Sequence, residues 1–99
     1  MSVGVYTLTV RAAEQFRNVV EARAPGTDVT LLHDLDASKR LKQHARQADL
    51  FVLVTASTKH AATDCVRASR PADKPLVIPA GKGAASMLAA VRCHFEQGG

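Results

Sequence analysis

The chain of 99 residues is long enough for one modest hydrophobic core, and we expect residues 1–99 to form a single domain. Apolar residues make up 46% of the chain and charged residues 22%, which excludes an intrinsically disordered protein. The net charge of +4 favours acidic partners only weakly, because soluble proteins commonly carry such a charge.

The sequence shows no signal peptide, and its longest apolar run is too short to cross a membrane. The two cysteines, Cys65 and Cys93, lie far apart and form neither a CxxC pair nor a zinc-ligand spacing. We therefore expect a cytoplasmic protein that does not associate with membranes, in which both thiols are reduced and buried within helices.

Strand and helix patterns alternate four times along the chain. Runs of β-forming residues predict strands over residues 3–10, 28–33, 49–54 and 76–78. Apolar residues at helical spacing predict helices over residues 11–24, 39–47, 59–69 and 84–95. The last helix is expected to pack through Met87 or Leu88, Val91 and Phe95.

This alternation predicts an α/β fold with right-handed crossovers, in which helices cover both faces of a four-stranded parallel sheet. The most economical strand order is 2-1-3-4, a small doubly wound, three-layer arrangement of the flavodoxin or Rossmann-like type. In that order the chain reverses direction between strands one and three. Ligands of such sheets bind in the crevice outside the carboxyl ends of the strands at this point.

The stretch from Asp49 to His60 supplies both the centre of the core and the strongest candidate for a site. Its five apolar residues fit a strand that is buried on both faces, and from Thr55 onward the residues become small and polar. Three hydroxyl groups, the Lys59 ammonium and the first amides of a helix converge there, which suits a phosphate or a carboxylate. A well-capped helix with a solvated lysine is the alternative.

A second glycine-rich turn, Gly81-Lys82-Gly83, precedes the last helix. It lacks the spacing of a Walker motif, but two glycines let backbone amides approach an anion; a plain turn is the alternative. Together with polar residues at the other strand ends, the candidate ligand-binding residues are Arg11, His33, Asp34, Thr55, Ser57, Thr58, Lys59, His60, Gly81, Lys82, Gly83 and Ser86.

Catalysis and metal binding have weaker support. His60 could act as a general base with Asp64 or Asp34, yet no nucleophile is indicated, and we assign no catalytic residue. His33 and His60 could bind a metal or haem iron, but nothing fixes a third ligand, so we assign no metal site and leave the cofactor open.

One predicted helix presents a row of cations, namely Lys39, Arg40, Lys42 and Arg46. Clustered positive charge favours nucleic acid, although no aromatic residue interleaves it for base stacking. A solvated helix face or contact with an acidic protein surface are the alternatives.

Several short segments resemble the DUF2325 family, among them Ala48–Thr55, His60-Ala-Ala, Lys74-Pro75-Leu-Val, Gly83-Ala-Ala-Ser86 with Leu88, and His33-Asp34. The resemblance covers roughly residues 28–92 and implies a small α/β module that is often fused or accessory to other proteins, with no settled activity. Members of that family have a glycine-rich turn after the first strand, whereas this chain has Thr9-Val10-Arg11-Ala12-Ala13.

The combined prediction is a non-catalytic module that binds an anionic small ligand, a nucleotide or a phosphate-like molecule. Two open sheet edges and alanine-rich helices favour a homodimer or a subunit of a larger complex. The alternatives are an interaction subunit without a ligand and a small enzyme that uses His60.

Overall fold

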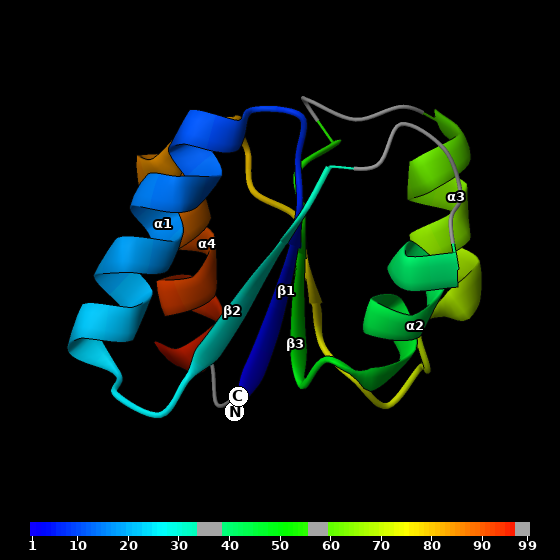
Figure 1. Ribbon diagram of the computed structural model, residues 1–99, viewed down its shortest axis with the longest axis horizontal. Helices are drawn as coiled ribbons and strands as arrows, with labels where there is room; N and C mark the ends of the chain where they lie inside the picture. The colour runs from blue at the N-terminus through cyan, green and yellow to red at the C-terminus, as the bar shows by residue number, and fades with distance from the viewer. Residues whose placement is uncertain (34–38, 56–59, 97–99) are drawn as a thin grey trace.

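Four strands and four helices alternate along the chain. The structure is a computed structural model that describes residues 1–33, 39–55 and 60–96 (Figure 1). All strand pairs are parallel, and the order β2-β1-β3-β4 confirms the predicted order and fold class. The elements are β1 (Ser2–Tyr6), α1 (Val10–Arg23), β2 (Asp28–Leu32), α2 (Lys39–Gln47), β3 (Leu50–Leu53), α3 (His60–Ser69), β4 (Leu76–Val77) and α4 (Ala84–Glu96).

The sheet lies between two layers of helices. Figure 1 shows α1 and α4 on one face of the sheet and α2 and α3 on the other. Side chains of a strand alternate between these faces, so Val5 of β1 joins the core beneath α1 and α4, whereas Tyr6 joins the core beneath α2 and α3. All four residues of β3 are buried, which confirms the prediction of a central strand covered on both sides.

β1 ends at Tyr6, four residues earlier than predicted. The next residue, Thr7, still donates its amide to the carbonyl of Leu32 at 3.1 Å. Its hydroxyl oxygen then accepts the amide of Thr9 at 3.0 Å, which turns the chain out of the sheet so that α1 begins at Val10. Strand propensity alone does not predict this local hydrogen bond. Every other predicted end of a strand or helix lies within one residue of the observed end.

Two side chains of α4 are more exposed than predicted. Phe95 was expected on the packed face of this helix, yet 48% of it is exposed. Cys93 was expected to be buried and is exposed, whereas Cys65 in α3 is buried as predicted. The core contacts of α4 come from fully buried Met87 and from the partly buried Leu88, Ala90 and Val91, whereas Cys93 and Phe95 near the end of the helix are exposed.

The amino end of β3 is tied to the amino end of β1 by Asp49. Its carboxylate accepts the backbone amide of Ser2 at 2.8 Å, and the Asp49 amide donates to the Ser2 hydroxyl oxygen at 3.1 Å. These bonds align the two central strands at their first residues. In the part of the chain that the structure describes, none of the helices has the length and hydrophobicity that a membrane span requires.

Candidate functional site

The carboxyl ends of the two central strands form the floor of the candidate site. β1 and β3 pair directly, and beyond their last residues the amide of Val54 donates to the carbonyl of Tyr6 at 3.0 Å. The chain then leaves β1 toward α1 on one face and β3 toward α3 on the other. This divergence is the reversal point at which parallel α/β sheets bind ligands, and the sequence located it correctly.

Positive charge gathers where the helices begin. None of the four helices has an acidic residue in its first turn. Instead, Arg11 lies in the first turn of α1, and Lys39 and Arg40 begin α2; all three are exposed. A helix already has a partial positive charge at its amino end, so cations there are unfavourable unless an anion lies nearby.

The turn before α4 adds a lysine and an accessible backbone. Lys82 and Gly83 are exposed, and a Cβ atom at Gly83 would meet nothing within 4 Å. At Gly81 an added Cβ would lie 2.9 Å from Oγ of Ser86, so this glycine leaves room for the Ser86 hydroxyl. Because α1 and α4 pack side by side on one face of the sheet, Arg11 and this turn lie at the same end of one helical layer (Figure 1).

The strand order separates some of the predicted residues from others. His33 follows β2 and Gly81 follows β4, and these are the two outer strands. Neighbouring strands lie about 4.8 Å apart, so three strand intervals separate the two loops by roughly 14 Å. One phosphate group therefore cannot contact both, whereas a ligand as long as a nucleotide could reach from one to the other.

Part of the predicted site lies outside the described residues. Asp34, Ser57, Thr58 and Lys59 belong to the two segments that the structure does not describe, and for His60 only the backbone, as the first residue of α3, is described. Thr55 and Asp64 are exposed. The role of these residues stays a prediction.

The described residues contain no group of three or more His, Cys, Asp or Glu side chains that could hold a metal ion. The four predicted cations of α2 are all exposed and leave Leu41 and Ala45 to face the core. That arrangement agrees equally with a solvated face, with a surface for an acidic protein and with a contact for nucleic acid.

Sequence reasoning missed a buried arginine at the opposite edge of the sheet. Arg70 follows α3 and is only 8% exposed. Its guanidinium donates to the carbonyl oxygens of Ala45 and Ala48 at the end of α2, and to that of Pro75 at 2.7 Å. Burial lowers the pKa of Arg70, and the neighbouring carboxylate of Asp49 raises it in part. No sequence pattern marked this position, because its acceptors are backbone carbonyls, which every residue has.

The fold and the cationic edge define a class: a small parallel α/β domain of the doubly wound type, with helix amino ends and basic side chains around the reversal point. Within this class the chain belongs to the DpdD-like family, whose model matches residues 1–90.

This match corrects the resemblance to the DUF2325 family, which was wrong. The segments that suggested it are short, and much of their pattern is what any buried parallel strand followed by a polar helix start requires. No curated protein and no solved structure matches the chain.

Proposed function

We propose that this protein is a non-catalytic α/β module that binds an anionic small ligand, a nucleotide or a phosphate-like molecule, at the carboxyl edge of its sheet. The single observation that supports this proposal best is the concentration of positive charge at the helix starts. Arg11, Lys39 and Arg40 lie in first turns that have no acidic residue, where a cation disfavours the helix by itself. With an anion bound beside them, these cations would stabilise the helix starts instead of destabilising them.

The span of the edge favours a nucleotide over inorganic phosphate. Arg11 and the turn at Lys82 could hold a phosphate group near the ends of β1, β3 and β4, and the strand end of β2 extends the binding surface beyond it. Exposed glycine backbone at Gly83 permits close approach of phosphate oxygens to the chain.

A thermal-shift series tests the proposal with phosphate, pyrophosphate, ADP, ATP and GTP at constant ionic strength. We expect a nucleotide to raise the melting temperature by several degrees at a concentration well above its Kd, because a ligand that binds only the folded state stabilises it. Lys82→Ala and Arg11→Gln should each reduce this shift. Arg67→Gln changes an exposed arginine of α3 away from the helix starts and should leave it intact.

Two results would contradict the proposal. Either no anion in the series raises the melting temperature, or the shift is the same in the Lys82 and Arg11 variants as in the unchanged protein. In the second case the anions bind elsewhere on a protein of net charge +4.

We also propose that the chain works as a homodimer or within a larger complex and that it acts inside the cell. A function in protein interaction without a ligand is the second candidate, and a specific observation favours it: an apolar groove on the face formed by α1 and α4.

A further inference from the structure

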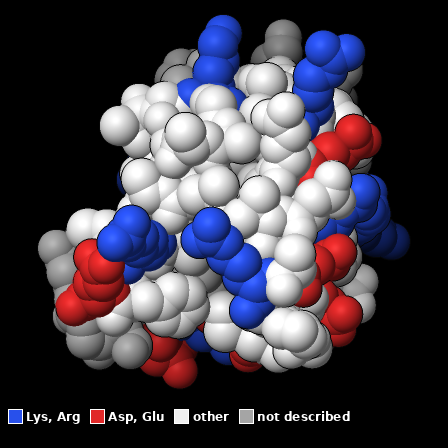
Figure 2. Space-filling model, turned by 90° about the vertical axis from the view of Figure 1, so that its left-hand side faces the viewer, with Lys and Arg blue, Asp and Glu red and all other residues white. Residues whose placement is uncertain are grey.

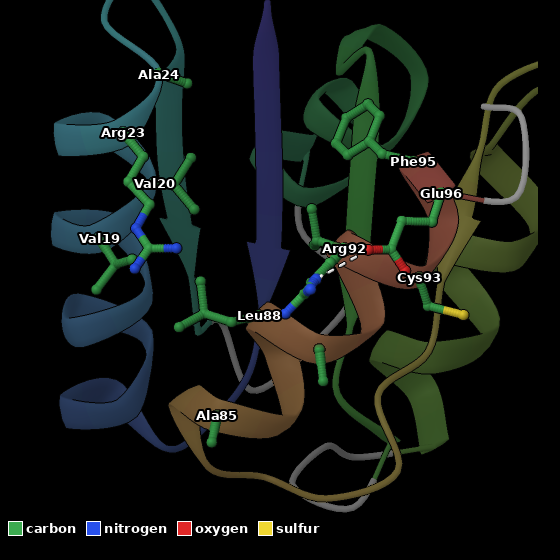
Figure 3. A pocket seen from close by; sticks show the side chains of 12 residues that line it. Val19, Val20, Arg23, Ala24, Ala85, Leu88, Arg92, Cys93, Phe95 and Glu96 are labelled. Atoms are coloured by element: carbon green, nitrogen blue, oxygen red, sulfur yellow. Dashed lines mark hydrogen bonds and ion pairs between the residues drawn. The ribbon is translucent and has the colours of Figure 1, made fainter.

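A groove of about 740 Å³ runs between α1 and α4. Its walls include Val19 and Val20 of α1, Ala24 directly after that helix, and Leu88, Val91 and Phe95 of α4, so its lining is mainly apolar (Figure 3). Val20, Leu88 and Val91 are only partly buried, although they pack against the core beneath the two helices. The groove therefore extends the core outward to a surface that the described residues do not cover.

Phe95 is the largest apolar side chain exposed on this surface. It comes from the last turn of α4 and is 48% exposed, which is unusual for a phenylalanine without a partner. Figure 2 shows an uncharged area in the upper middle of this face, with basic side chains at the top of the molecule and another basic side chain across the centre of the face below it. A contiguous apolar surface of this kind on a small protein marks an interaction site.

Charges at one end of the groove identify the occupant. Arg23 is the last residue of α1, and Glu96 is the last residue of α4. Figure 3 shows these two residues on opposite sides of the groove, and both line it. Arg23 contacts no carboxylate in the described part of the chain, whereas Glu96 pairs with Arg92 at 3.0 Å in an exposed contact of low strength.

The two helices run in the same direction, because each follows a strand of a parallel sheet. A twofold axis along the groove would therefore place α1 of one copy against α4 of the other with their ends at the same level. Each Arg23 would then face the Glu96 of the partner copy, and each Phe95 would lie against Val20 and Ala24 across the interface. Reciprocal contacts of this kind are what an isologous interface requires.

We propose that the groove between α1 and α4 is the interface of a homodimer with this twofold symmetry. The proposal specifies the surface for the self-association proposed above and does not depend on anion binding. The face in Figure 2 spans 28 × 22 Å between Cα atoms. A stable interface buries about 800 Å² per partner, so both helices must take part along most of their length.

The open edge of β2 is a less suitable contact. The amide of Asp28 donates to the carbonyl of Met1, and the amide of Thr7 donates to the carbonyl of Leu32, so these residues pair β2 with β1. The residues between them in β2 alternate, and Val29 therefore directs its backbone amide outward from the sheet. The carboxylate of Glu21 accepts the outward amide of Val29 at 3.5 Å and places a negative charge on the edge. Charged side chains on an edge strand oppose pairing with a second sheet.

Sedimentation equilibrium of the unchanged protein and of charge-reversed variants tests the interface. We expect a dimer at about 100 µM, because interfaces of this size give micromolar or lower dissociation constants. Arg23→Glu and Glu96→Arg should each weaken the dimer by about tenfold or more, since each change places two like-charged pairs across the twofold axis. The double variant should restore it, because the reversed charges again face each other.

Arg67→Glu and Asp64→Arg reverse exposed charges on α3, in the opposite helical layer, and should leave the dimer unchanged. Phe95→Ser alters an exposed side chain, so it should fold with an unchanged circular dichroism spectrum and be monomeric.

Three outcomes overturn the proposal. The unchanged protein could be monomeric at that concentration, the double variant could fail to restore association, or the α3 variants could weaken the dimer as much as the groove variants. A monomer whose groove binds an acidic amphipathic peptide would assign this surface to another protein and overturn the homodimer as well.

Discussion

Gly4 leaves space for an aromatic ring at the centre of the sheet. It pairs with Phe51 of β3, and a Cβ atom at Gly4 would lie 2.8 Å from Cδ2 of that ring. The ring is fully buried and has no free space into which it could move without disturbing its neighbours. The missing side chain of Gly4 is therefore a packing requirement rather than a need for unusual backbone angles.

We predict that Gly4→Ala lowers the free energy of unfolding by about 1–3 kcal/mol, because the added methyl group overpacks the core. Chemical denaturation at equilibrium measures this change. Gly83→Ala is the matched control, since nothing lies within 4 Å of its added Cβ, and it should leave stability nearly unchanged. Combining Gly4→Ala with Phe51→Leu should cost less than the sum of the two changes; additive losses would contradict the direct contact.

Asp49 provides a stability contribution that depends on pH. The hydrogen bond from the Ser2 amide holds the pKa of this carboxyl below its usual 3.8. A folded-state pKa below the unfolded one stabilises the protein above the unfolded pKa, and this contribution is lost as the pH falls through the folded pKa.

We therefore predict that Asp49→Asn lowers the melting temperature at neutral pH, and that the difference from the unchanged protein shrinks as the pH falls below about 4. Thermal melts between neutral and strongly acidic pH follow this difference. Asp64→Asn, an exposed carboxylate on α3, is the control. A difference that stays constant across the whole range would show that the ionised carboxylate is not responsible.

At the scale of elements, Arg70 connects three parts of the fold with one side chain. Its donors reach the last carbonyls of α2 and the residue before β4, while its own backbone follows α3. The guanidinium also lies 5.9 Å from the centre of the Phe51 ring. A cation at the end of α2 is favoured by the partial negative charge of that helix end, and its carbonyl oxygens would otherwise lack partners.

We predict that Arg70→Met lowers the free energy of unfolding by about 2–4 kcal/mol, since it leaves buried carbonyl groups without hydrogen bonds. Arg70→Lys should recover only part of this loss, because an ammonium group cannot reach both sets of acceptors in the planar geometry of a guanidinium. Equilibrium denaturation of both variants and of the exposed control Arg67→Met tests this. Equal stabilities for Arg70→Lys and the unchanged protein would disprove the role of the planar fork.

At the scale of the whole molecule, the sequence predicted the architecture well and the interactions between elements poorly. The alternation of short apolar runs with helical patterns was sufficient for the strand order, because few topologies join four such units without crossing. The packed face of α2 was also predictable, since Leu41 and Ala45 are apolar among cations. Such features depend on the local pattern of residue types.

What the sequence did not reveal depends on residues far apart in the chain. The contacts of Arg70 with α2, and the gap between α1 and α4 that leaves Phe95 exposed, both arise from how helices are positioned over the sheet. For the candidate site, the sequence predicted the reversal point of the sheet between β1 and β3, whereas the roles of the residues around it stay predictions. The separation of His33 from Lys82 follows from the strand order, which was predicted, because three strand intervals lie between the two outer strands.

The position of β1 in the middle of the sheet has a consequence for the order of folding. Of the four strands, β1 is synthesised before the others, yet one of its two neighbours, β3, begins only at Leu50. Until that segment emerges, one side of β1 has no hydrogen-bond partner, and only the unit β1-α1-β2 can assemble. Closure of the sheet must then wait for long-range pairing, which slows folding relative to chains whose neighbours in space are also neighbours in sequence. The nascent chain is therefore exposed to misassembly for the time needed to translate α2 and the start of β3.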